Sequence, residues 1–393
     1  MHSAPGASDA SGGTPQTVGR DEWLQPIRYD LSNPEERAAY VRLCDATDER
    51  LVYDSVAATL SELYELRNPA QASDTERREQ FVAGMLGEDM SYGEGVLFPW
   101  SGELVRYPTR NDFLEAHTGR YKQLITAEEQ EILNGGVVGI AGQSVGASGA
   151  VQIAQNALAG TILIGDFDRI SPSNLGRIPG DQRDIDKLKV VRTAQQISHI
   201  NPFLQQVHFS SGINAENVKE FFAHRPNVVL DAVDNLRIKA MLRIWAARTG
   251  TPLVMATDVD DMVVLDVERY DKKGQLPFGG RLKPSEVLTL ARGEATDEQI
   301  GRWTLKLVGL RNVTPRMLDS AAERGKTIAG MPQLGSTTAV AGAKSAVAAR
   351  DITLGRTVPS GRTVVSRKPL HLSGDDGVVN LLRSARHYIQ AQK

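Results

Sequence analysis

The chain has 393 residues, with 45 Lys and Arg, 48 Asp and Glu, a formal net charge of -3 and a single cysteine. This length predicts two domains, or one large domain with an appendage. The balanced charge argues against a broad nucleic-acid or anionic-membrane surface, because both need an excess of Lys and Arg. One cysteine excludes an internal disulfide framework and a zinc site built from cysteine pairs, so we expect no zinc.

The first 20 residues are rich in Ser, Gly, Pro and Thr and lack the apolar centre of a secretory signal. This composition predicts a disordered leader over residues 1–20. No apolar run approaches the ~18 residues that a membrane span requires. We therefore expect a cytoplasmic protein with neither a membrane nor a nucleic-acid partner.

Residues 21–116 form a predicted N-terminal accessory region. Helix formers with apolar spacing make it mainly helical, and they run through three segments: 34–44, 56–66 and 81–86. The stretch 92–108 combines β-branched and aromatic residues with Gly and Pro, which indicates a hairpin or a packing loop. Cys44 lies on a predicted helix, where we expect a buried small hydrophobe and not a nucleophile.

Strands and helices alternate from residue 126 onward. Thr126 and Glu129 have the spacing of a capping box at the start of a short helix. The predicted strands are 136–141, 161–165, 207–211, 228–233, 252–257 and 262–270. The predicted helices are 147–159, 187–200, 214–224, 235–249 and 336–354. This order implies an α/β, Rossmann-like domain with a mostly parallel sheet and helices on both faces.

A glycine-containing loop follows the predicted strand that ends at Ala141. Gly142, Ser144 and Ala147 fit the dinucleotide-binding pattern G-x-G-x-x-G/A, with serine at the second glycine. The pattern provides a tight turn, a close backbone approach to phosphate, and a helix N-terminus whose free N–H groups face the anion. The Ser144 hydroxyl could itself donate. Asp166 ends the next strand, where an acid binds ribose hydroxyls; a glycine turn without a ligand is the alternative.

Further polar residues follow on successive strand ends. Hydride transfer requires a nicotinamide pocket and not further cations. Phosphoryl or nucleotidyl transfer does need them, since negative charge spreads over the reacting phosphate and the leaving pyrophosphate. Singly, Arg177 could be a surface ion pair, Lys189 a solvated helix residue, and Asp234 a helix N-cap. Their order along the chain favours phosphate chemistry, with Asp234 as a Mg²⁺ ligand.

These motifs resemble the ThiF/MoeB/HesA family, the bacterial relatives of ubiquitin-activating enzymes. The similarity covers about residues 119–354 and rests on the stretches VVGIAGQSVGAS, ILIGDFDRISPSNLGR, LKVVRTAQQISHINP, VVLDAVDN and PLVMATD. Residues 92–108 resemble a subgroup with an N-terminal helper region. A ThiF-type adenylation domain over 117–393 is therefore expected, with 280–330 as a crossover excursion.

The resemblance implies an ATP- and Mg²⁺-dependent adenylyltransferase of the ubiquitin-like modifier activating type, working as a homodimer. It would activate a carboxylate, namely the C-terminus of a small ubiquitin-like or sulfur-carrier protein or of a peptide, and release pyrophosphate. Residues 21–116 and 280–330 are the candidates for recognising this substrate.

The resemblance also implies a role for each matching residue. Asp166 would hold the ribose, and Asn174 and Arg177 the phosphates. Lys189 would bind the triphosphate and Asp234 the Mg²⁺, while Asp168 supports the loop. Arg120 matches an arginine that reaches into the partner subunit's site. The remaining nucleotide-binding positions would be Gly142, Ser144, Gly146, Ala147 and Asn235.

The sequence departs from the family in two ways: it lacks the paired zinc-binding cysteines, and it has no cysteine after the adenylation motifs. We therefore expect an enzyme that stops at the acyl-adenylate or passes it to an external nucleophile. Two other functions remain open. One is an NAD(P)-dependent oxidoreductase on the same fold; the other is a non-catalytic nucleotide-binding scaffold whose altered loop at Ser144 signals lost chemistry.

Overall fold

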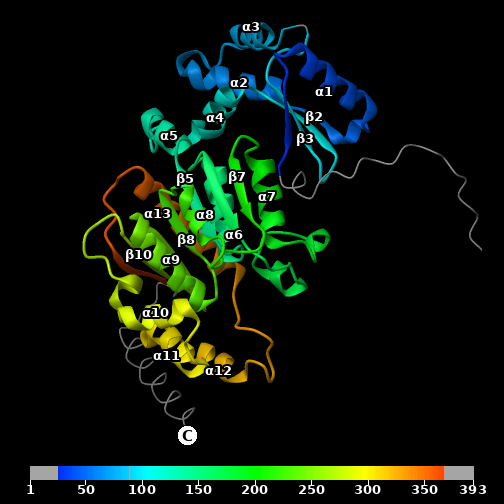
Figure 1. Cartoon of the computed structure of the whole chain (residues 1–393). Helices are drawn as coiled ribbons and strands as arrows, with labels where there is room; N and C mark the ends of the chain where they lie inside the picture. Colours follow the sequence, from blue (N-terminus) through cyan, green and yellow to red (C-terminus); the bar gives the residue numbers. More distant parts are fainter. Residues whose placement is uncertain (1–24, 88, 367–393) are drawn as a thin grey trace, which may run out of the picture.

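A seven-stranded sheet forms the centre of the molecule in the computed structural model, which describes residues 25–87 and 89–366 (Figure 1). The leader predicted over 1–20 lies outside the described residues. Within the described ranges, no helix has the length and apolar character needed to cross a membrane. From one edge to the other, the strands are β11 (Gly361–Ser366), β10 (Met262–Glu268), β9 (Leu253–Val259), β8 (Val228–Asp231), β5 (Val137–Ala141), β6 (Thr161–Gly165) and β7 (Gln205–Phe209).

The sheet is parallel from β7 to β9, and β10 and β11 extend it antiparallel. This confirms the mostly parallel sheet expected from the sequence. The chain runs outward from β5 through β6 to β7 and then returns to the other side of β5 as β8. Ligands of open α/β sheets bind at the carboxyl ends of the strands where the order reverses, here between β5 and β8.

Helices cover both faces of this sheet. The aliphatic side chains of one face pack against α6, α7 and α13, and those of the other face against α8 and α9. The helices of this domain are α5 (Ala127–Asn134), α6 (Val145–Gln155), α7 (Lys189–Ile200), α8 (Val218–Ala223), α9 (Leu236–Thr249), α10 (Pro284–Arg292), α11 (Asp297–Val308), α12 (Pro315–Glu323) and α13 (Gly335–Thr353). Helices α10 to α12 form the predicted excursion.

Local signals explain most of the helix starts. Thr126 and Glu129 make the predicted capping box of α5, so that prediction is confirmed. The helix expected from residue 214 instead begins at Val218, because the side chains of Asn214 and Asn217 accept each other's backbone N–H groups in a preceding turn. Asn and Asp side chains compete with the helix in this way at its start.

The N-terminal region has its own four-stranded sheet, with the order β1 (Ile27–Asp30), β3 (Glu94–Phe98), β4 (Glu103–Tyr107) and β2 (Val52–Asp54). Its helices are α1 (Pro34–Ala46), α2 (Val56–Arg67), α3 (Thr75–Leu86) and α4 (Arg110–Thr118). Of the two alternatives for 92–108, the hairpin is the one found, as the antiparallel β3–β4 pair. The outer strands β1 and β2 were not expected, because they are short and largely exposed and so carry no alternating pattern.

The N-terminal region and the excursion lie at opposite ends of the large sheet (Figure 1). The N-terminal region contacts the last turn of α7, where Trp100 donates a hydrogen bond to His199, and the connection from α7 to β7, where Arg28 lies over the ring of Phe203. That connection leads into the amino end of β7. The excursion is bound at the carboxyl end of β9, where Thr314 donates to Asp260, and Gln333 in the segment that follows it donates to Asp258. The carboxyl ends of the parallel strands form one edge of the sheet, which we call the carboxyl edge. Of the two candidates for substrate recognition, 280–330 lies at this edge within one chain, and 21–116 does not.

Candidate functional site

The loop after β5 is packed tightly against the end of β8. Gly142 has φ +90°, and a Cβ there would lie 2.4 Å from the carbonyl oxygen of Ala232. A Cβ at Gly146 would lie 2.7 Å from a methyl carbon of Ile140. Both positions therefore require glycine, for conformation at Gly142 and for space at both. Ala147 is buried against this turn. The predicted glycine loop thus occupies the crevice between β5 and β8.

Ser144 connects this loop to Arg177. Its φ of -94° is negative, so this position does not need the left-handed conformation that favours glycine. The side-chain oxygen of Ser144 accepts a hydrogen bond from Nε of Arg177 at 3.0 Å. The structure therefore brings together two predicted site residues that are 33 positions apart.

Asp166 lies beside the same loop, at the end of β6. One carboxylate oxygen accepts from the backbone N–H of Gln143 at 2.5 Å and the other from that of Asp168 at 2.8 Å. Burial raises the pKa of Asp166 above its ordinary value, and these two hydrogen bonds partly oppose the shift. Each oxygen keeps a further lone pair, so the carboxylate can still accept from ribose hydroxyls. Sequence reasoning did not single out Gln143, because its contribution is a backbone N–H.

Lys189 is paired with Asp168. Its Nζ lies 2.7 Å from a carboxylate oxygen of Asp168, and the lysine side chain is 8% exposed against 51% for the aspartate. The backbone N–H of Lys189 also donates to the carbonyl of Asp168. The two predicted residues therefore act as a unit that fixes the segment after β6 to the start of α7.

Two predicted amide side chains are engaged locally. Asn174 is buried in a short 3₁₀ turn, and its side-chain oxygen accepts from the backbone of Ser171. Asn235 is the N-cap of α9, and its side-chain oxygen accepts from the backbone of Arg237 and Ile238. Both residues therefore shape the loops of the site, and their contact with a nucleotide stays a prediction.

Asp234 is exposed after the end of β8, and Asn235, not Asp234, caps the helix that follows. No described residue donates a hydrogen bond to the Asp234 carboxylate. Residues 25–87 and 89–366 hold no group of three or more His, Cys, Asp or Glu placed to bind a metal ion. Mg²⁺ at nucleotide sites is commonly held by one or two carboxylates together with substrate phosphates. A single unpaired carboxylate at the carboxyl edge fits that mode of binding.

Arg120 does not join these residues. It lies in a 3₁₀ turn ahead of α5, and α5 leads into the amino end of β5, whereas the other predicted residues follow the carboxyl ends of strands. The side chain is exposed. Its predicted role in a partner subunit's site stays a prediction.

The family comparison agrees with this arrangement. The model described as the ThiF family matches residues 120–260, which include the glycine loop, Asp166, Arg177, Lys189 and Asp234. The chain contains a ThiF family domain.

Three curated proteins are similar to the chain that carries this ThiF domain. The uncharacterized protein MT1398 of Mycobacterium tuberculosis (strain CDC 1551 / Oshkosh) is 35% identical over 269 residues, which are 68% of this chain and 37% of that protein. The sulfur carrier protein ThiS adenylyltransferase of Escherichia coli (strain K12) is 30% identical over 132 residues, 33% of this chain and 52% of that protein. The tRNA threonylcarbamoyladenosine dehydratase of the same strain is 31% identical over 151 residues, 37% of this chain and 55% of that protein. The chain thus spans between about a third and a half of the length of these relatives.

Solved structures also align with the chain, at lower identity. Escherichia coli MccB with MccA-N7isoASN has a TM-score of 0.47 at 15% identity, covering 76% of this chain and 77% of that chain. Escherichia coli TcdA in complex with ATP has a TM-score of 0.45 at 19% identity, covering 61% of this chain and 95% of that chain.

A second group of charges in the ThiF domain lies beneath the site, and sequence reasoning missed it. Asp231, the last residue of β8, contacts Lys239 Nζ at 3.0 Å and Arg243 Nη1 at 2.5 Å. Arg243 also contacts Glu268 at 2.8 Å and lies over the ring of Phe278, with its guanidinium carbon 3.8 Å from the ring centroid. We call Asp231, Lys239, Arg243 and Glu268 the buried cluster. The signal in the sequence was an acid inside the apolar stretch VVLDAV, followed by cations four residues apart on one helix face.

The buried cluster is held by attraction between opposite charges. Burial alone would raise the pKa of Asp231, but the charges of Lys239 and Arg243 outweigh it and lower that pKa. Tyr270 and the backbone of Phe278 donate to the Glu268 carboxylate at 2.6 and 2.8 Å. These contacts join β8, α9 and β10, and Asp234 follows three residues after Asp231.

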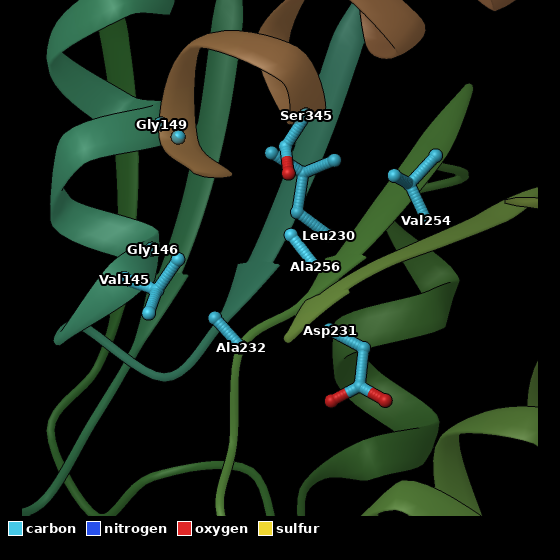
Figure 2. Close-up of a pocket in the computed structure, with 10 residues that line it drawn as sticks. Val145, Gly146, Gly149, Leu230, Asp231, Ala232, Val254, Ala256 and Ser345 are labelled. Carbon is cyan, nitrogen blue, oxygen red and sulfur yellow. The ribbon is translucent and has the colours of Figure 1, made fainter. Parts of the chain in front are cut away.

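A small cavity of the ThiF domain lies on the other face of β8 (Figure 2). Its walls come from α6, α13 and the ends of β8 and β9, including Val145, Leu230, Ala256 and Ser345. In Figure 2 the Asp231 carboxylate points away from these side chains, as expected for neighbours on a strand. The cavity volume of about 10 Å³ is near that of one water-sized sphere, so this is a packing gap and not a nucleotide pocket.

Proposed function

We propose that this chain is an ATP- and Mg²⁺-dependent adenylyltransferase that converts a carboxylate into an acyl-adenylate. The ThiF domain supports this proposal, as does the likeness to the protein named ThiS adenylyltransferase. The substrate carboxylate would be the C-terminus of a small ubiquitin-like or sulfur-carrier protein or of a peptide.

The contact between Ser144 and Arg177 is the observation that carries the proposal. It holds a cation beside the N-terminus of α6, and the Asp166 carboxylate lies on the same loop. A helix N-terminus and a fixed guanidinium suit phosphate groups, and an acid at the end of the second strand suits ribose hydroxyls.

The proposed reaction is the transfer of AMP to the substrate carboxylate. An oxygen of the substrate carboxylate attacks the α-phosphorus of ATP, and the bond from that phosphorus to the bridging oxygen breaks, which releases pyrophosphate. Charge grows on the leaving pyrophosphate, and Arg177 and Lys189 would stabilise it. The contact with Asp168 fixes the Lys189 ammonium. Mg²⁺, held by Asp234 and phosphate oxygens, would neutralise further charge on the same group.

We further propose that no enzyme thiol takes the acyl group. Cys44 lies on α1 in the N-terminal region, whereas the site follows the strands of the other sheet. Burial raises the pKa of the Cys44 thiol, which lowers its thiolate fraction. The acyl-adenylate would then pass to an external nucleophile.

A homodimer is part of the proposal, with Arg120 reaching the site of the partner subunit.

Pyrophosphate exchange tests this proposal. Purified protein is incubated with ATP, Mg²⁺, labelled pyrophosphate and candidate proteins or peptides that end in a free carboxylate. We expect label in ATP only when a suitable carboxylate is present, and loss of exchange in a folded Asp234→Ala variant. Exchange at the wild-type rate in that variant would refute the site. Binding of ATP with no exchange by any carboxylate would favour a scaffold, and binding of NADH without ATP an oxidoreductase.

A further inference from the structure

We infer that Ser144 is a positioning residue: it holds the Arg177 guanidinium against the N-terminus of α6 so that the terminal nitrogens face the nucleotide phosphates. The inference rests on the proposed function, since it requires a phosphate chain at this loop. It assigns a use to the serine that stands where the family pattern has glycine.

The Ser144 side chain does not make the hydrogen bond that a serine usually makes at a helix N-cap. Serine at an N-cap normally accepts a hydrogen bond from the backbone of the first helical turn. Ser144 is the N-cap of α6 but makes no such bond, and its oxygen accepts from Nε of Arg177 instead. The first N–H groups of α6 therefore keep no side-chain cap from Ser144, and they can bind an anion.

The backbone of Arg177 is fixed independently of its side chain. Its N–H donates to the carbonyl of Asn174 at 3.0 Å. Gly335, at the start of α13, packs so closely that a Cβ there would lie 2.4 Å from the carbonyl oxygen of Gly176 and 3.3 Å from the Cα of Arg177. With the backbone held in this way, the Ser144 hydroxyl selects the direction of the guanidinium.

The contact with Ser144 leaves most of the guanidinium available. Arginine has five N–H donors, of which Nε carries one and the two terminal nitrogens carry four. Within the described residues, no carboxylate pairs with Arg177 and no acceptor contacts its terminal nitrogens. Lys189 differs, because its ammonium is already bound to Asp168. Arg177 is thus a fixed cation with free donors next to an uncapped helix N-terminus, which suits a bidentate contact with phosphate.

The contact with Arg177 changes what serine at position 144 is expected to do for nucleotide binding. If serine at this position signalled lost chemistry, Ser144→Gly would restore the family pattern and improve nucleotide binding. If Ser144 orients Arg177, Ser144→Gly removes the acceptor of Nε and weakens binding of the phosphates. The two hypotheses therefore predict opposite changes in ATP affinity for Ser144→Gly.

The test is a set of calorimetric titrations of the full chain with Mg·ATP and, separately, with adenosine. The variants are Ser144→Ala, Ser144→Gly, Ser144→Thr, Arg177→Ala and the double variant Ser144→Ala with Arg177→Ala. We expect Ser144→Ala and Ser144→Gly to raise the Kd for ATP about tenfold, as for a hydrogen bond to a charged group. Ser144→Thr keeps the hydroxyl and should bind ATP nearly as the wild type does. The Kd for adenosine, which has no phosphates, should stay unchanged in all of them.

The double variant separates positioning from an independent effect. If Ser144 acts through Arg177, Ser144→Ala adds less than about twofold once Arg177 is alanine, because the coupling has already been lost. The inference is overturned if the two effects multiply, if Ser144→Thr binds as weakly as Ser144→Ala, or if Ser144→Gly binds ATP more tightly. Wild-type protein that binds no ATP would overturn the proposed function itself, and so the two failures are distinguishable.

Discussion

Two groups of charged side chains lie near the carboxyl ends of the parallel strands, and they differ in whether every charge has a partner within the protein. In the buried cluster, Asp231, Arg243 and Glu268 are closed to solvent, and Arg243 contacts both carboxylates and lies over the ring of Phe278. The group at the carboxyl edge, which we call the edge residues, consists of Asp166, Asp168, Arg177, Lys189 and Asp234. There, Arg177 keeps free donors and Asp234 has no partner among the described residues.

Residues of the same type can serve stability in one group and function in the other. Asp231 and Asp234 belong to one short motif, yet Asp231 is buried against two cations while Asp234 is exposed. We expect removal of one member of the network around Asp231 to destabilise the fold, because it leaves a buried charge without its partner. The exposed carboxylate of Asp234 is available to a ligand.

The largest expected effect is on stability, in the buried cluster. Arg243→Ala leaves the buried carboxylates of Asp231 and Glu268 with Lys239 as the one remaining cation of the cluster. Breaking such a network lowers the free energy of unfolding by about 3–5 kcal/mol. Chemical denaturation followed by circular dichroism would measure the free energy of unfolding. Arg183→Ala is the control, because that arginine is largely exposed beside Asp181 and its loss should leave the unfolding midpoint unchanged. Equal midpoints for both variants would contradict the assignment of Arg243 to stability.

The next effect is on activity, at the edge residues. Lys189→Met keeps most of the buried aliphatic chain but removes the ammonium beside Asp168. We expect pyrophosphate exchange to fall about 100-fold, as when one donor to a developing negative charge is lost. The unfolding midpoint should change less than in Arg243→Ala. Undiminished exchange in a folded Lys189→Met variant would show that the Lys189–Asp168 pair is only structural.

The smallest effect is on the pH dependence of stability, and it has opposite signs in the two groups. The pKa of Asp166 is raised in the folded protein, so its ionised form opposes folding at neutral pH and this cost disappears as the pH falls through the raised value. The pKa of Asp231 is lowered, so its contribution is present above the ordinary value of 3.8 and is lost as the pH falls through the lower folded value.

Unfolding free energies measured from pH 7 to pH 3 would show both effects. Relative to Asp166→Asn, the wild type should gain stability as the pH falls. Relative to Asp231→Asn, the wild type should lose stability toward the acid end. Parallel curves for the two variants would contradict the assignment of different environments.

The sequence predicted the large sheet and the glycine loop because both depend on local pattern. Buried strands ending in glycine or aspartate and a capping box at Thr126 are visible within a few residues. The contacts that decide the roles of the charges are not local. The Ser144–Arg177 bond joins residues 33 positions apart, and the Arg243–Glu268 pair depends on how α9 packs against β10.

The N-terminal sheet shows the same limit. Its central hairpin was predictable from aromatic and β-branched residues around turn residues. The outer strands β1 and β2 have four and three residues, mostly exposed, and they are strands only because they pair with that hairpin. Their pairing is a tertiary contact that no local pattern carries.

The most direct test compares Asp231→Asn with Asp234→Asn, measuring both the free energy of unfolding and pyrophosphate exchange with Mg·ATP. We predict that Asp234→Asn unfolds at the wild-type denaturant concentration but loses exchange by about 100-fold or more. Asp231→Asn should unfold at a clearly lower denaturant concentration. Wild-type exchange in Asp234→Asn, together with unchanged stability in Asp231→Asn, would contradict the assignment of Asp234 to activity and of Asp231 to stability.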